Sequence, residues 1–106
     1  MTLDELFTKM IDKATRTTVA DSVKGVILLN LTGPEPRRWL VSLLEGKIKI
    51  NEDDTTPPDL TVTTSGATLI EVALRKTNPM AAFMTGKIKV NGDTGLVSQL
   101  KNIWPD

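Results

Sequence analysis

Apolar residues near the start of the chain recur at the spacing of one helical face. Thr2 followed by Glu5 fits a capping box, and acidic residues in a first turn suit the positive end of the helix dipole. The polar stretch 15–22 would end this helix. We therefore predict an amphipathic helix after Thr2 whose apolar face comprises Leu3, Leu6, Phe7, Met10, Ile11 and Ala14.

The following part of the chain has the patterns of strands, first as an apolar run and then as alternating apolar and polar residues. The pair Glu45-Gly46 separates two of these segments and predicts a tight hairpin turn. Residues 51–58 are rich in Asn, Asp, Thr and Pro, which predicts a loop. The alternation favours a sheet with one packed face and one wet face, as antiparallel sheets allow. The predicted strands are 24–31, 37–44, 47–50 and 60–63.

The second half of the chain combines helical patterns with one more strand. Residues 67–76 carry apolar side chains at helical spacing, and Asn78 followed by Pro79 predicts a helix over 79–84. Residues 87–90 alternate as a strand. Asp93 can cap a last helix, whose apolar stripe is Leu96, Val97, Leu100, Ile103 and Trp104. This order predicts one α+β domain over residues 1–106, with five strands and about four helices.

Composition and charge narrow the classes of function. Of the 106 residues, 13 are Lys or Arg and 13 are Asp or Glu, so the formal net charge is zero. Aromatic residues make up only 4% of the chain. We expect no nucleic-acid partner, because that binding rests on neutralising phosphates and, for single strands, on stacking bases against aromatic rings.

Residue types that carry catalysis are scarce. The chain has no Cys and no His, so the commonest general base and the usual transition-metal ligands are missing. No serine lies in a Gly-x-Ser-x-Gly motif, and no glycine-rich phosphate loop occurs. The run Glu52-Asp53-Asp54 offers oxygens to a hard cation but lacks the spacing of a calcium loop, so a solvated loop is the better interpretation. We expect no enzyme, no catalytic residues, no metal and no cofactor.

Lysines and the N-terminus bear on membranes and location. Lys47, Lys49, Lys87 and Lys89 lie on the polar sides of two predicted strands, and a shared sheet would align them as a basic strip for peripheral contact with anionic lipid. The alternative is that they protect strand edges from aggregation. The first residues are acidic, which does not fit a secretion signal. The longest apolar run, Val26–Leu29, is too short to span a membrane. We expect a cytoplasmic protein.

A more specific pattern lies in residues 78–96. It reads Asn-Pro, then Ala-Phe, a Gly-Lys-Ile-Lys strand, a glycine, and Gly-Leu at the start of the last helix. This resembles the sterol carrier protein type 2 family. Asp59–Thr63 and the apolar helix after it resemble the family more loosely, as does the segment Trp39–Gly46. The resemblance covers about residues 26–100.

The resemblance implies a five-stranded, largely antiparallel sheet flanked by helices, with an apolar tunnel between the sheet and the helices. Such a tunnel would hold a hydrophobic small molecule such as a fatty acid, fatty acyl-CoA, sterol or phospholipid, and the chain would bind and possibly transfer this lipid without catalysis. The residues expected to contact the lipid are Phe83, Met84, Leu96, Val97, Leu100, Trp104, Ile88 and Leu69.

One departure from the family pattern concerns the lipid headgroup. The family often reads Lys-Leu-Gln in its last helix, whereas this chain reads Gln99-Leu100-Lys101. An amine at this position would favour a carboxylate or phosphate over a sterol hydroxyl, so Lys101 and Gln99 are headgroup candidates. The alternative is a solvated lysine near a helix C-terminus.

A second class of function stays open. The family occurs both as free domains and fused to enzymes. The chain could therefore be a protein-interaction or substrate-presenting module without a lipid, whose apolar last helix docks on a partner. That partner could be an enzyme or a second copy of the chain in a dimer.

Overall fold

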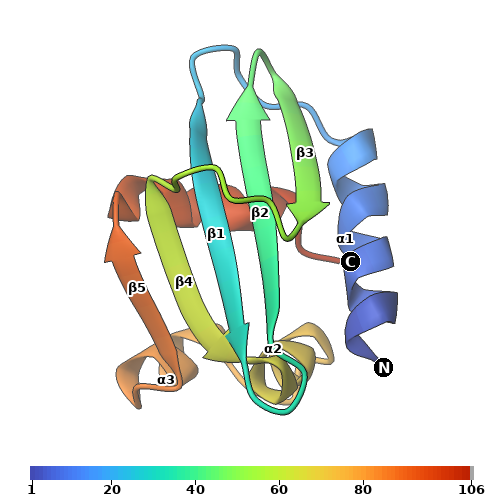
Figure 1. Cartoon of the computed structure of the whole chain (residues 1–106), viewed down its shortest axis with the longest axis vertical. Coiled ribbons are helices and arrows are strands. Elements are labelled where there is room, and N and C mark those ends of the chain that lie inside the picture. Colours follow the sequence, from blue (N-terminus) through green and yellow to red (C-terminus); the bar gives the residue numbers. More distant parts are fainter. Residues whose placement is uncertain (106) are drawn as a thin grey trace.

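Helices and strands follow one another in the predicted order (Figure 1). The computed structural model describes residues 1–105. The predicted α+β class with a five-stranded sheet and four helices is confirmed, and most boundaries move by a few residues. The elements are α1 (Leu3–Arg16), β1 (Gly25–Thr32), β2 (Arg37–Leu44), β3 (Lys47–Glu52), β4 (Leu60–Ser65), α2 (Gly66–Ala73), α3 (Pro79–Met84), β5 (Ile88–Gly92) and η1 (Thr94–Asn102).

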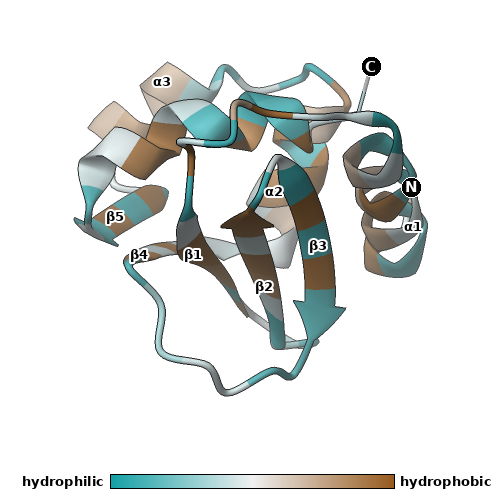
Figure 2. Cartoon of the chain, turned by 90° about the horizontal axis from the view of Figure 1, so that it is seen from above, coloured by the Kyte–Doolittle hydropathy of each residue, from teal (hydrophilic) through white to brown (hydrophobic). Residues whose placement is uncertain are grey.

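The sheet has the strand order β3-β2-β1-β4-β5. Its neighbours pair antiparallel, except that β4 lies parallel to β1. The chain therefore has to cross the sheet between β3 and β4, and residues 53–59 make this crossing over the face that carries no helix (Figures 1 and 2). Both ends of the crossing are fixed, because the Asp53 amide donates to the Arg38 carbonyl and the Asp59 amide to the Val26 carbonyl.

The predicted hairpin turn joins β2 to β3. Leu44 pairs with Lys47 across it, which leaves Glu45 and Gly46 as the two turn residues. Their φ angles are 53° and 78°, both in the left-handed region. A type I′ turn needs a positive φ at both positions, and its twist matches the twist of the two strands.

All four helices cover one face of the sheet (Figure 2). Alternate residues of β1 and β2, among them Ile27, Leu29, Trp39 and Val41, point into this layer and are at most 4% exposed. α1 contributes the apolar face that the sequence predicts. Its buried residues are Leu3, Leu6, Met10 and Ala14.

The opposite face of the sheet is not wholly wet, contrary to the sequence prediction. Leu28 and Leu40 pair with each other on that face, yet they are only 4% and 1% exposed. Residues 53–59 run across the same face. The sheet therefore has a second, smaller apolar centre beneath the crossing loop, which explains why β1 reads as a continuous apolar run.

The last helix differs from the predicted α-helix. η1 is a 3₁₀ helix of nine residues, started by the Asp93 side chain, which accepts a hydrogen bond from the Gly95 amide. A nine-residue 3₁₀ helix extends roughly 18 Å, against roughly 13.5 Å for an α-helix. The longer span carries the chain across the back of the sheet, from β5 toward α1 (Figure 1).

None of the helices formed by residues 1–105 is long and apolar enough to cross a bilayer.

Candidate functional site

One hollow lies where the end of α2, the start of α3 and the C-terminal segment meet. Its volume is about 350 Å³. The hollow lies beside the apolar interior, since Trp104 packs against the buried core and also lines the hollow. The remaining lining residues are Val72, Arg75, Thr77, Asn78 and Pro79.

A short connection builds this hollow. Arg75 has a φ of 62°, and this left-handed residue turns the chain sharply after α2. The Thr77 hydroxyl donates to Glu71 Oε2 at 2.8 Å, which ties the connection back to α2. Asn78 then caps α3, because its Oδ1 accepts from the Met80 amide at 2.8 Å, and Pro79 occupies the first helical position as predicted. The two helices are therefore held at fixed positions on either side of the hollow.

A second hollow of about 200 Å³ lies between α1 and β3. It has apolar and polar walls, since Ile11, Ala14, Ile48 and Ile50 line it together with Thr15, Lys49 and Asn51.

The predicted lipid-contact residues fall into two groups. Leu69 and Leu96 are buried, at 6% and 8% exposed, and belong to the core between sheet and helices. Ile88, Leu100 and Trp104 are half-buried and pack against this core. These five residues therefore face the same interior, although their contact with a lipid stays a prediction.

The other three predicted lipid-contact residues lie at the surface. Phe83 is 50% exposed, Met84 79% and Val97 38%. For Phe83 and Met84 the reason is the length of α3, which has six residues and buries only Ala82. A helix of this length presents most of its side chains to solvent, which a pattern of apolar residues does not reveal.

The two headgroup candidates lie at the end of η1. The Gln99 side-chain oxygen accepts a hydrogen bond from Asn102 Nδ2 at 2.8 Å. Lys101 is exposed, in the last turn, where a cation suits the helix dipole. Their role toward a headgroup stays a prediction.

The predicted basic strip does not form, and this prediction is wrong. Lys47 and Lys49 lie on β3, whereas Lys89 lies on β5, and these strands are the two opposite edges of the sheet. Three strands separate them, or roughly 19 Å at the usual spacing. The placement fits the alternative interpretation, in which lysines guard edge strands.

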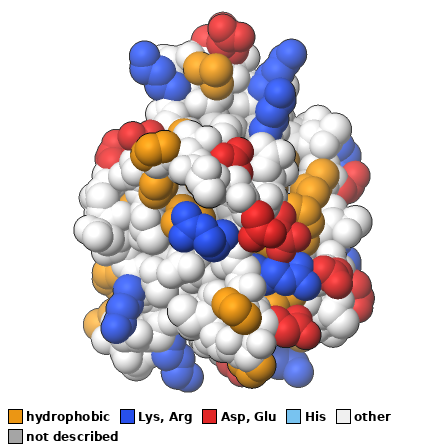
Figure 3. All heavy atoms as spheres, in the orientation of Figure 1, with side chains coloured by type: hydrophobic (Ala, Val, Ile, Leu, Met, Phe, Trp, Pro, Cys, Tyr) orange, Lys and Arg blue, Asp and Glu red, His pale blue; other side chains and the backbone are white. Residues whose placement is uncertain are grey.

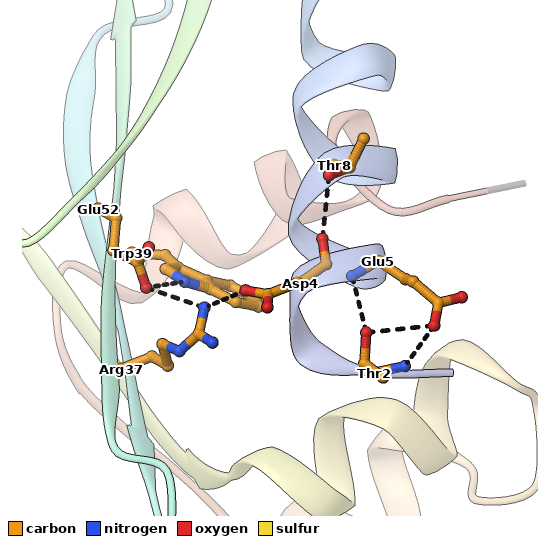
Figure 4. Close-up of polar contacts among 7 residues, drawn as sticks. All are labelled: Thr2, Asp4, Glu5, Thr8, Arg37, Trp39 and Glu52. Atoms are coloured by element: carbon orange, nitrogen blue, oxygen red, sulfur yellow. Dashed lines mark hydrogen bonds and ion pairs between the residues drawn. The ribbon is translucent and has the colours of Figure 1, made fainter.

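A polar junction that the sequence reading missed ties α1 to the sheet (Figure 4). The Arg37 guanidinium lies 2.8 Å from Asp4 Oδ1 and 3.1 Å from Glu52 Oε2. The same Glu52 oxygen accepts from the indole N–H of Trp39 at 3.3 Å, and the Trp39 ring lies 5.0 Å from that of Phe7. The hydrogen bond from Arg37 to Asp4 is the main cause that raises the pKa of Arg37. Glu52 therefore belongs to the sheet rather than to a solvated loop.

The other acids of that run remain in the crossing loop. Asp54 accepts hydrogen bonds from the hydroxyl and the amide of Thr56, which lower the pKa of its carboxyl. Within residues 1–105 no cluster of three or more acidic side chains could hold a metal ion.

Comparison with known proteins identifies the family to which this chain belongs. The sequence pattern of the SCP-2 sterol transfer family matches residues 3–104. The chain belongs to this family. Proteins of the SCP-2 sterol transfer family are associated with the binding and transfer of lipids, and the resemblance seen in the sequence is confirmed.

Individual relatives agree. Hydroxysteroid dehydrogenase-like protein 2 of Xenopus laevis is 29% identical over 95% of this chain, and sterol carrier protein 2 of Bos taurus is 32% identical over 67%. The matched regions are only 24% and 13% of those two proteins, so the SCP-2 chain described here spans a small part of their length. The solution structure of palmitated SCP2L2 from Aedes aegypti has the same fold, with a TM-score of 0.78, 23% identity, and coverage of 94% of this chain and 91% of that one.

Proposed function

We propose that this SCP-2 chain binds a hydrophobic lipid between its sheet and its helices and performs no catalysis. The proposal rests on one observation: this chain belongs to the family and has an apolar interior beside a hollow of about 350 Å³, which Trp104 lines. The ligand class is a fatty acid, fatty acyl-CoA, sterol or phospholipid. A fatty acid is the first candidate, since the Aedes aegypti relative is described as palmitated.

The helix layer has one element suited to open and close. η1 and its C-cap rest on the sheet through Leu96 and Ile103, which are 8% and 1% exposed. The neighbouring residues Leu100 and Trp104 are only half-buried. Hydrogen bonds in a 3₁₀ helix have poorer geometry than those in an α-helix. Lipid uptake and release would therefore follow loosening of η1, while α1 and the sheet stay in place.

Titration of delipidated protein with a fluorescent fatty acid tests the proposal. We expect saturable binding that unlabelled fatty acid reverses, and competition by acyl-CoA, phospholipid and sterol would rank the ligand classes. A folded, cooperatively melting protein that binds none of these lipids would refute the proposal.

Filling the hollow provides a test of the site. Thr77 lines the hollow, and a Thr77→Trp substitution would occupy it with an indole ring. We expect fatty-acid binding to weaken about tenfold, which corresponds to about 1.4 kcal/mol. Ala67→Trp adds the same ring at an exposed position in the first turn of α2 and should leave binding unchanged. Equal affinities of the two variants would exclude this hollow as part of the site.

Lys101 provides a test of ligand selectivity. If its ammonium group meets a carboxylate or phosphate, Lys101→Gln will lower the affinity for fatty acid about fivefold, as the loss of one exposed charge pair suggests, and will leave the affinity for sterol unchanged. Lys76→Gln removes an exposed lysine elsewhere and serves as the control. Parallel competition titrations with both ligands measure the ratio, and an unchanged ratio would assign Lys101 to the solvated surface.

A second candidate function rests on the length of the relatives. The matched region is 24% of the hydroxysteroid dehydrogenase-like protein and 13% of bovine sterol carrier protein 2. Domains of this kind therefore occur within much longer chains, which favours a module that presents a substrate to an attached or partner enzyme. Lipid binding by the isolated chain separates the two functions, since the module without a lipid ligand would show none.

A further inference from the structure

α3 presents an apolar surface that the fold does not use. Met80, Phe83 and Met84 are 66%, 50% and 79% exposed. Their spacing of three and four residues places them on one face of a single helical turn. The opposite side of the turn is anchored, because Ala82 is 1% exposed and its carbonyl accepts from the Lys87 amide at 2.8 Å. These three side chains, which we name the α3 patch, therefore project from a fixed support.

The segment of the chain that carries the α3 patch is basic. Residues 72–92 contain Arg75, Lys76, Lys87 and Lys89 and no Asp or Glu, although the chain as a whole is balanced at 13 and 13. In Figure 3, basic and apolar side chains are visible at the lower left corner of the molecule, where Figure 1 places α3. Glu71 lies directly before this segment, and its carboxylate accepts a hydrogen bond from the Thr77 hydroxyl.

We propose that the α3 patch docks this chain on the surface of an anionic lipid bilayer. Two unbranched methionines and a phenylalanine that project from a convex turn can enter the boundary between headgroups and acyl chains. Cations beside them gain about 1 kcal/mol each near an anionic leaflet. The combination of protruding apolar side chains and a basic segment matches a bilayer better than it matches a grooved protein surface.

The position of the α3 patch connects docking to lipid uptake, and this step rests on the proposed function. Arg75, Asn78 and Pro79 line the hollow of about 350 Å³, and Pro79 is the first residue of α3. A chain docked through α3 would therefore hold this hollow close to the bilayer. A lipid would reach the interior without crossing the surrounding water.

Flotation of the full chain with vesicles tests the docking surface. The vesicles are phosphatidylcholine with one quarter phosphatidylglycerol, and the variant is Met80→Gln/Met84→Gln. We expect its partition coefficient to fall about tenfold. The matched control is Ile11→Gln/Leu44→Gln, which removes two apolar side chains that are 37% and 60% exposed on α1 and β2. The control should bind vesicles like the unmodified chain, and an equal loss in both variants would overturn the proposal.

Charge provides an independent readout. Lys87→Gln should weaken binding to the anionic vesicles about fivefold, and pure phosphatidylcholine vesicles should bind the unmodified chain more weakly. Absence of binding to anionic vesicles at low salt would overturn the proposal and leave the α3 patch to a protein partner. Fluorescent fatty acid added without vesicles should bind the single variant Met80→Gln normally, because Met80 is not among the predicted lipid-contact residues. Failure of the proposed lipid site would abolish that signal even in the unmodified chain, so the two failures are distinguishable.

Discussion

At the scale of single residues, we expect the hydrogen bond between Trp39 and Glu52 to contribute measurably to the free energy of unfolding. Trp39 is fully buried, and the described contact of its indole N–H is with Glu52 Oε2. Glu52→Ala would leave this N–H without its acceptor, which costs about 1–3 kcal/mol for a buried donor. We expect a loss of unfolding free energy in this range, measured by urea denaturation.

Two further variants separate this cause from a general loss of charge. Glu52→Gln keeps an oxygen that can accept from the indole and should cost less than Glu52→Ala. Glu35→Ala removes an exposed carboxylate in the turn between β1 and β2, and surface changes of this kind usually stay within about 0.5 kcal/mol. A Glu52→Ala variant as stable as Glu35→Ala would show that the junction contributes nothing to stability.

At the scale of elements, Leu96 of η1 closely approaches Gly25, the first residue of β1. A Cβ atom at Gly25 would stand 2.8 Å from Leu96 Cδ1. We expect Gly25→Ala to cost about 2 kcal/mol, from the strain of a positive φ together with the displacement of Leu96. Gly33→Ala is the matched control, because Gly33 has a φ of +118° and no atom within 4 Å of the added Cβ. Equal losses in the two variants would mean that Leu96 does not seat η1.

The same scale shows how far the sequence predicts this molecule. Helix caps, the Glu45-Gly46 turn and the five strands are readable because each depends on neighbouring residues, through hydrogen bonds or period-two burial. The parallel pairing of β1 with β4 is not readable, since it depends on where residues 53–59 carry the chain. The lysines illustrate the consequence. The sequence predicts the strands that carry them, but it does not reveal that β3 and β5 form opposite edges of the sheet.

The candidate site is less predictable than the fold, because the burial of a side chain depends on the whole structure around its element. Leu69 and Leu96 face the interior because strong apolar patterns fix their sides of the elements. Phe83 and Met84 have an equally apolar pattern, yet α3 is too short to bury them. The 3₁₀ form of η1 gives the segment a longer span than an α-helix would, and the apolar pattern of the sequence does not reveal this form.

At the scale of the whole molecule, the proposed interior links ligand binding to stability. A ligand that binds only the folded state stabilises it by about 2.7 kcal/mol when its free concentration is 100 times its Kd. For a domain of this size, 1 kcal/mol shifts the melting temperature by about 4–8 °C, so saturation with fatty acid should raise it by about 10–20 °C. Thermal melts of delipidated and loaded protein measure the shift. Thr77→Trp should show a smaller shift at the same fatty-acid concentration, because its hollow is filled. A melting temperature that stays constant through a demonstrated titration would place the fatty acid on the surface and on the unfolded chain alike, and would contradict a site between the sheet and the helices.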